Sequence, residues 1–197
     1  MKTLKKVIVA VLLSTLASLS TVTSADLIVI DQERQIKQLI KKLAEPYDLV
    51  ETITVIAKIE SNFGLYVVNL AEGSCGITQI NIKTYIARHK IKDTRFNRNK
   101  ACSDLVNSYE LSIANSIEEL VYWKQQFCNK KTGKCSPKQY ENIIRAYNGG
   151  WKGYRGKQTA EYYEKFKNFH KELFPKVRKI ETKPKKKTPN IKVINVQ

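Results

Sequence analysis

The sequence predicts a mainly α-helical fold, with one domain over residues 26–174 and a flexible basic tail over residues 175–197. Apolar residues recur at three- and four-residue spacing in several long stretches, which is the period of an amphipathic helix. No pair of stretches shows the two-residue alternation that predicts paired strands. All eight glycines come after residue 63, where they mark loops between the helical stretches.

Residues 1–25 have the three parts of a secretory leader. A basic start, MKTLKK, precedes the apolar run VIVAVLLSTLASL, and small residues lead to a cleavage site at Ala25. The apolar run is too short to span a bilayer comfortably. We therefore expect export, cleavage after Ala25 and a location in the periplasm or at the cell envelope. An uncleaved signal anchor is the alternative.

The expected helices cover residues 31–44, about 48–60, 109–127, 137–148 and a last stretch from about residue 159. The first presents Ile36, Ile40 and their neighbours on one side and ends before Pro46. Asp48 is the expected N-cap of the second helix, and Ser136 is the expected N-cap of the fourth. The fourth should stop at Asn148-Gly149.

The four cysteines all follow the leader: Cys75, Cys102, Cys128 and Cys135. An even number of cysteines in an exported chain predicts two disulfides. Because the intervening NKKTGK looks like a turn, we favour a Cys128–Cys135 pair, which leaves Cys75 with Cys102. The sequence has no C-x-x-C, and His89 and His170 are isolated, so we expect neither a metal site nor a cysteine nucleophile. No cofactor is expected.

The chain is strongly basic, with a formal net charge of +17 and a pI near 9.7. Loss of the leader leaves +14, and the tail holds eight positive charges against one negative. Its Lys- and Pro-rich composition cannot build a core, so we expect a solvated tail that could also tether the protein to an anionic envelope surface. The same charge would suit nucleic acid, but the leader argues against that partner.

Glu60 extends an apolar stripe. Ile53, Ile56, Ala57 and Glu60 stand at i, i+3, i+4 and i+7, on one side of the second helix. Burial and the negative end of the helix dipole both disfavour a carboxylate there, which predicts a raised pKa and a general acid near neutral pH. Taken alone, the stripe favours a partly exposed Glu at a helix end, and the motifs that follow shift the balance toward an acid.

Further motifs follow Glu60-Ser61 in order. They are Gly76-Ile77-Thr78-Gln79, then Ala146-Tyr147-Asn148-Gly149-Gly150, then Tyr162 on the last expected helix. In this order, over about residues 45–170, the chain resembles the soluble lytic transglycosylases. The resemblance implies a lysozyme-like domain that binds peptidoglycan glycan strands and cleaves the MurNAc–GlcNAc bond.

The resemblance also assigns residues. Glu60 matches the single catalytic acid, and the matching substrate-binding positions are Ser61, Asn69, Gln79, Tyr147, Asn148 and Tyr162. Thr78 departs from the family's usual Met. Trp151, in a glycine-rich loop, is a further candidate for stacking on a sugar, whereas we expect Trp123 to pack in the interior. In its small size and its Gln79-Ile80-Asn81 run, the chain resembles the transglycosylases that accompany secretion or conjugation machines. This resemblance implies such an apparatus as a partner.

Glycosidases usually need two carboxylates, but only one lies in a motif here. One acid suffices if the C6 hydroxyl of N-acetylmuramic acid attacks its own C1, and the resemblance implies this reaction and its 1,6-anhydromuramoyl product. A lysozyme-type hydrolase, with Glu72 or a positioned water completing the site, is the first alternative. A non-catalytic wall- or envelope-binding protein on the same fold is the second, and a cationic membrane-active protein is the third.

Overall fold

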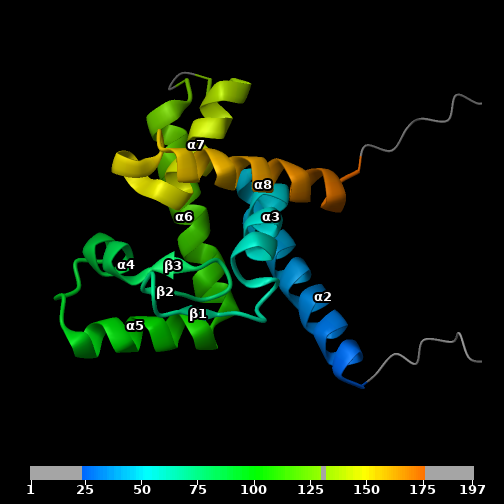
Figure 1. Ribbon diagram of the computed structural model, residues 1–197, viewed down its shortest axis with the longest axis vertical. Helices are drawn as coiled ribbons and strands as arrows, with labels where there is room; N and C mark the ends of the chain where they lie inside the picture. The colour runs from blue at the N-terminus through cyan, green and yellow to red at the C-terminus, as the bar shows by residue number, and fades with distance from the viewer. Residues whose placement is uncertain (1–23, 130–131, 176–197) are drawn as a thin grey trace, which may run out of the picture.

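The computed structural model describes residues 24–129 and 132–175 (Figure 1). The predictions for the leader before Ser24 and for the tail after Pro175 lie outside the described residues. The elements are α2 (Ser24–Ala44), the 3-10 helix η1 (Glu45–Tyr47), α3 (Val50–Ser61), β1 (Val68–Asn69), β2 (Ser74–Cys75), β3 (Ile80–Asn81), α4 (Ile82–Arg88), α5 (Arg95–Asn107), α6 (Tyr109–Phe127), α7 (Pro137–Gly153) and α8 (Lys157–Leu173). Helices dominate the described part of the chain, which confirms the mainly α-helical prediction.

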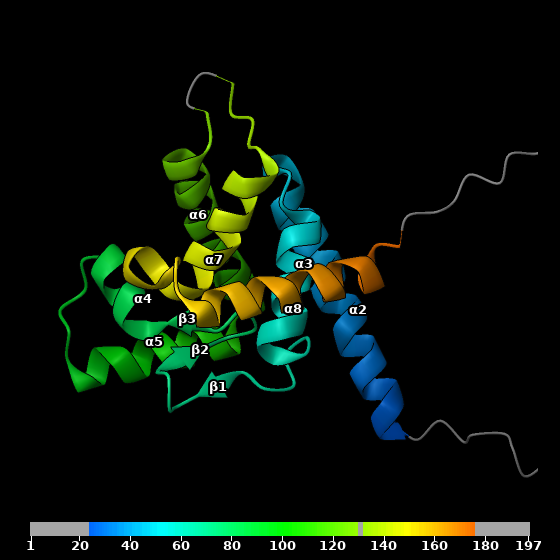
Figure 2. The same ribbon diagram turned by 45° about the horizontal axis from the view of Figure 1, so that its top comes forward.

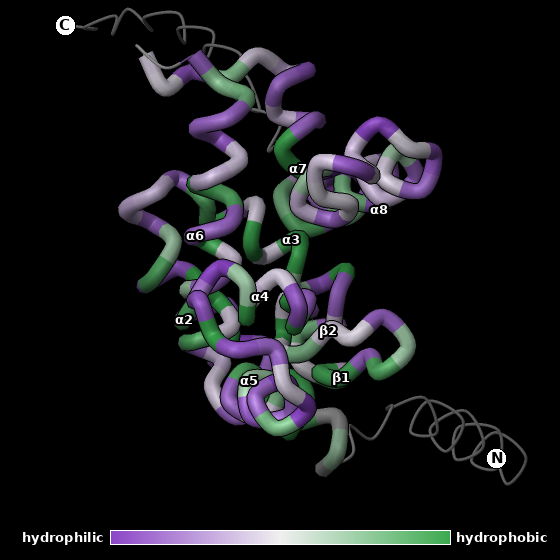
Figure 3. Tube along the Cα trace, turned by 90° about the vertical axis from the view of Figure 1, so that its left-hand side faces the viewer, coloured by the Kyte–Doolittle hydropathy of each residue, from purple (hydrophilic) through white to green (hydrophobic). Residues whose placement is uncertain are grey.

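The larger core surrounds α3, whose residues from Thr52 to Ala57 are all buried. Helices α2, α6, α7 and α8 supply most of the rest of this core, and Phe63 and Ile77 are among the residues that the connecting segments add. The ribbon of α8 crosses α3 in both views, and the two helices pack together (Figure 2). In the hydropathy view, the buried α3 is flanked by helices with long hydrophilic stretches, such as α8 (Figure 3). Packing on all sides therefore fixes α3 and the residues at its end.

A smaller core belongs to the sheet and to α4 and α5. The three short strands pair antiparallel in the order β1-β2-β3, and each contributes only two residues. Ile80, Ile86 and Leu105 are buried in this second core. The Cys75–Cys102 disulfide joins β2 to α5. The sheet with α4 and α5 thus forms a small lobe against the helical body (Figure 1).

The second disulfide, Cys128–Cys135, closes the connection between α6 and α7. Both pairs agree with the pairing favoured from the sequence, and disulfides suit an oxidising compartment outside the cytosol. None of the described helices is both long and apolar enough to cross a membrane.

Several boundaries differ from the sequence predictions. Helix α2 begins at Ser24 rather than residue 31. Asp48 is not the N-cap of α3: it has a positive φ of 55° and ends η1, while Leu49 precedes α3 without a side-chain cap. Ser136 does cap α7, in a reciprocal capping box with Gln139. That helix passes Asn148 and bends at Gly150, where φ is 60° and ψ is −169°.

The sheet and two helices are absent from the sequence prediction. Strands of two residues are too short to show an alternating pattern, and α5 is polar on nearly every side, with only Ala101 and Leu105 buried. Helix α4 spans seven residues, which is below the length at which a helical period becomes legible.

Candidate active site

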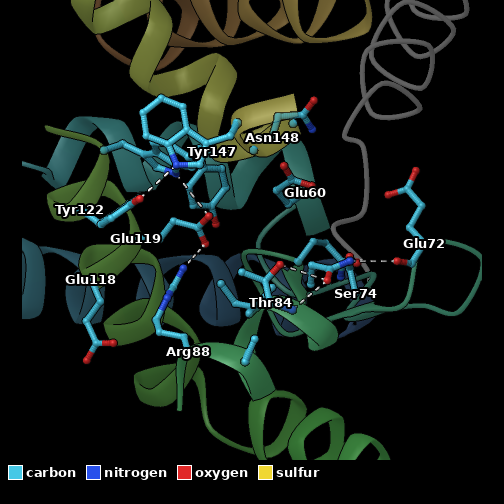
Figure 4. Close-up of a pocket in the computed structure, with 18 residues that line it drawn as sticks. Glu60, Glu72, Ser74, Thr84, Arg88, Glu118, Glu119, Tyr122, Tyr147 and Asn148 are labelled. Atoms are coloured by element: carbon cyan, nitrogen blue, oxygen red, sulfur yellow. Dashed lines mark hydrogen bonds and ion pairs between the residues drawn. The ribbon is translucent and has the colours of Figure 1, made fainter. Parts of the chain in front are cut away.

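A cleft of about 870 Å³ runs between the helical body and the small lobe (Figure 4). Its walls come from the end of α3, the sheet, α4, α6 and the bend of α7. This volume lies at the upper end of the range for small-molecule pockets, which is about 300–1,000 Å³. The cleft therefore has room for more than one sugar ring.

Glu60 lies on the wall of this cleft, in the last turn of α3. Its side chain follows the stripe of Ile53, Ile56 and Ala57, all fully buried. The Tyr162 hydroxyl, from α8, donates a hydrogen bond of 2.6 Å to Glu60 Oε1. Burial raises the pKa of Glu60 from 4.5 to about 7, although the Tyr162 hydrogen bond and the Lys165 charge lower it and the Glu72 charge raises it. A substantial fraction of Glu60 is thus protonated near neutral pH.

Tyr162 keeps its proton at the same pH. Burial is the main cause that raises the pKa of Tyr162 well above 10, and the neighbouring Glu60 charge adds to it. The sequence pairs this tyrosine with Glu60 only through the resemblance, because 102 residues separate them. The hydrogen bond ties α8 to the carboxyl group and fixes its orientation.

Ser61 does not face the cleft. It is 1% exposed, and its Oγ lies 2.7 Å from the Ile77 carbonyl and accepts a 2.8 Å hydrogen bond from the Gly64 amide. The expected substrate contact is therefore not supported. Instead, Ser61 connects the end of α3 to the segment that carries Gln79, and so positions Glu60 against the opposite wall.

Gln79 lines the cleft in a left-handed conformation, with φ of 50°. Its amide nitrogen donates to the carbonyls of Tyr66 and Gly76, both at 3.0 Å. These two bonds fix the amide plane, and its buried Oε1 has no hydrogen-bond partner among the described residues. Gly76 precedes this turn at φ of 85°, where a Cβ would stand 2.6 Å from Ser112 Oγ, so only glycine lets the loop approach α6.

Tyr147 also lines the cleft, with its hydroxyl in a buried polar network. The hydroxyl donates to the Thr78 carbonyl at 3.0 Å and lies 3.0 Å from Ser116 Oγ. Ser116 in turn donates to the Thr78 hydroxyl at 2.7 Å. Thr78 is fully buried in this network and does not line the cleft.

Asn148 and Trp151 line the cleft at the bend of α7. Asn148 is exposed, and Trp151 is 51% exposed. The Trp151 indole nitrogen donates to the Tyr122 hydroxyl at 3.1 Å, and its ring meets Trp123 edge-on at 5.0 Å between centroids. Trp123 is 4% exposed, so the expectation of packing holds for it. The exposed indole is available to stack on a sugar.

Asn69 lies outside the cleft lining. It ends β1, and its side-chain oxygen accepts a hydrogen bond of 3.3 Å from the Glu72 amide. Asn69 therefore shapes the turn that carries Glu72 instead of facing a ligand. Glu72 itself is exposed and does line the cleft, across from α6 in Figure 4.

The sequence reasoning missed the wall formed by α4 and α6. Arg88 and Glu119 form an ion pair of 3.1 Å there, and Glu118 and Tyr122 are further residues that α6 supplies to this wall. In the sequence, a charged residue that lines a cleft looks the same as one on the solvent-exposed side of a helix, so no sequence signal marked these positions. Four glutamates and one arginine supply the charged lining among the described residues, so the cleft is acidic in a strongly basic chain.

No group of three or more His, Cys, Asp or Glu residues in the described ranges is arranged to hold a metal ion. Comparisons of the chain with protein-family models, with curated proteins and with solved structures found no match.

Proposed function

We propose that this chain is an exported peptidoglycan lytic transglycosylase with a lysozyme-like fold, in which Glu60 is the general acid and base. One observation carries the proposal: a carboxyl group with a pKa of about 7 lies on the wall of a cleft that is large enough for more than one sugar ring. A general acid is most effective when its pKa is close to the working pH. The two disulfides and the leader support export.

In the proposed reaction, protonated Glu60 gives its proton to the glycosidic oxygen as the bond to C1 breaks. The resulting carboxylate then takes the proton from the C6 hydroxyl of the same N-acetylmuramic acid, and that oxygen bonds to C1. The product is a 1,6-anhydromuramoyl end, and Glu60 is protonated again. Tyr162 holds the carboxyl in place at 2.6 Å through both steps.

A hydrolase is the second candidate, because Glu72 lines the same cleft and its charge raises the pKa of Glu60. In that reaction, Glu72 would act as nucleophile or activate a water molecule, as the second carboxylate of a glycosidase does. The two candidates differ in product mass by one water and in their need for Glu72.

Mass spectrometry of products released from purified peptidoglycan separates these functions. We expect muropeptides that are lighter by one water and lack a reducing end. Glu60→Gln should lower the turnover by about 10²–10⁴-fold, the usual contribution of a general acid. Glu161→Gln, on the exposed side of α8, is the matched control and should act like wild type.

Reducing-end products that disappear in Glu72→Gln would instead establish the hydrolase. Specific binding to the wall without any released fragment would favour a non-catalytic wall-binding protein. Leakage from lipid vesicles that contain no glycan would favour a membrane-active protein.

A further inference from the structure

Arg88 ends α4 on the cleft wall, away from the motifs that suggested the function. Its Nη2 lies 3.1 Å from Glu119 Oε2, and its Nη1 donates to the Asn115 carbonyl at 3.4 Å. Figure 4 shows the guanidinium extending from α4 toward Glu119 on α6. The Arg88 side chain is 27% exposed and that of Glu119 is 14% exposed. The ion pair is therefore partly shielded, yet the arginine still faces the cleft.

The guanidinium keeps donors for a ligand. Arginine has five N–H donors, and the contacts with Glu119 and Asn115 are those that the described residues supply. Both Glu119 oxygens are engaged, because Trp123 Nε1 donates to Oε1 at 3.4 Å while Arg88 lies against Oε2. The carboxylate therefore holds the arginine fork in one orientation, which reduces the entropy lost when the fork binds a second acceptor.

Arg88 itself is the point of this otherwise acidic cleft that attracts an anionic group of a ligand. Arg88 is the one basic side chain among the described residues that line the cleft. The Glu118 side chain points away from the ion pair in Figure 4. Carboxylates are the groups that arginine binds with two parallel hydrogen bonds, and in peptidoglycan they belong to the peptide attached to N-acetylmuramic acid.

We propose that Arg88 binds a carboxylate of this peptide, so that the cleft prefers glycan whose peptide carboxylates are free over the same glycan with these carboxylates converted to amides. This inference rests on the proposed function, because it takes peptidoglycan as the ligand. Glu119 is a positioning residue in it: it orients Arg88 and competes with the ligand for the same charge. Arg88 and Glu119 should therefore have opposite effects on the preference.

The test compares two tetrasaccharide glycan fragments with peptides, one with free peptide carboxylates and one with these carboxylates converted to amides. The ratio is the dissociation constant of the amidated fragment over that of the free-carboxylate fragment. It is measured on the full chain carrying Glu60→Gln, so that no fragment is cleaved. We expect a ratio of about ten, the usual size of a charge-assisted hydrogen-bond pair. Arg88→Gln should bring the ratio close to one, and Glu119→Gln should raise it.

Arg98→Gln is the matched control. Arg98 lies on α5, outside the cleft, and forms an exposed ion pair with Asp93. This variant should keep the original ratio. Thermal unfolding of each variant shows that it is folded. A ratio near one in the Glu60→Gln parent, or a fall of the ratio in both Arg88→Gln and Glu119→Gln, would overturn the inference and leave the proposed function intact. No binding to either fragment would contradict both.

Discussion

Glu60 stands where a negative charge is unfavourable, at the end of a buried helical stripe and facing an acidic cleft. The hydrogen bond that the Tyr162 hydroxyl donates to it offsets this only partly. The helical period places Glu60 on the buried side of the helix, but the residues between Ile53 and Glu60 alone suit a partly exposed glutamate, and only the motifs that follow favoured a buried acid with a raised pKa. The partner of Glu60 could not be predicted from the helical period, because Tyr162 is 102 positions away and lies on a stripe that suits core packing equally well.

The raised pKa has a consequence for stability. The pKa of Glu60 is about 7 in the fold and about 4.5 in the unfolded chain, so the folded state binds the proton more tightly between these values. The free energy of unfolding should therefore decrease as the pH rises from 4.5 to 7 and should lose about 3 kcal/mol in all. Glu60→Gln lacks the titrating group and should escape this loss.

Chemical denaturation of wild type and Glu60→Gln at pH 4 and pH 8 checks this expectation. The two proteins should have similar stability at pH 4, and the variant should be more stable at pH 8. Glu161→Gln, measured in parallel, gives the effect of removing an exposed negative charge. A stability difference that is the same at both pH values would show that Glu60 is not forced to carry its charge in an unfavourable place.

Three other residues show how far single positions can be predicted. Ser61 and Asn69 were singled out by the resemblance to the transglycosylases, but their oxygens bind backbone amides and shape the loops around the cleft. Arg88 belongs to no motif and yet lines the cleft. A motif fixes position along the chain, whereas the direction of a side chain depends on contacts from other elements, here α6 for Arg88 and the Gly64 turn for Ser61.

At the scale of elements, long amphipathic helices were predictable and the small lobe was not. Helix α6 runs from Tyr109 to Phe127 as expected, because its apolar positions repeat over five turns. The lobe depends on two-residue strands, the polar helix α5 and a disulfide, which hold together through contacts distant in sequence. Local patterns carry little information about such an assembly.

The two disulfides should differ in their contribution. Cys75–Cys102 closes a loop with a sequence separation of 27, and Cys128–Cys135 closes one of 7. By loop entropy, these are worth about 3.5 and 2.5 kcal/mol, respectively. Cys75 also lies next to Ser74, which lines the cleft, so the double variant Cys75→Ala/Cys102→Ala should lose both stability and glycan binding.

Urea unfolding and glycan-fragment affinity of the two double variants test this difference. Cys128→Ala/Cys135→Ala is the matched control, because its disulfide closes the connection between α6 and α7 and neither cysteine lines the cleft. It should lose stability and keep its affinity. Equal losses of affinity in both variants would show that the small lobe does not depend on its own disulfide to shape the cleft.

At the scale of the whole molecule, charge is distributed unevenly. The chain without its leader has a net charge of +14, of which residues 175–197 hold half. The cleft has the opposite sign, with four glutamates against Arg88. Overall charge, readable from composition, therefore does not describe the site. Under the proposed function, attraction to an anionic wall and recognition of a glycan strand would belong to different parts of the molecule.

Deleting residues 176–197 should separate these two properties. Turnover of soluble glycan fragments should stay close to that of the full chain, because the cleft residues all lie between Glu60 and Trp151. Retention on whole sacculi should weaken at low salt and differ little at high salt, since the Debye length falls from about 10 Å at 0.1 M to about 3 Å at 1 M. Co-sedimentation across a salt series measures this.

A variant in which the eight basic tail residues become glutamine keeps the length and should behave like the deletion. Retention that survives this neutralisation, or a deletion that unfolds the domain, would mean that the tail acts through specific contacts and not through its charge.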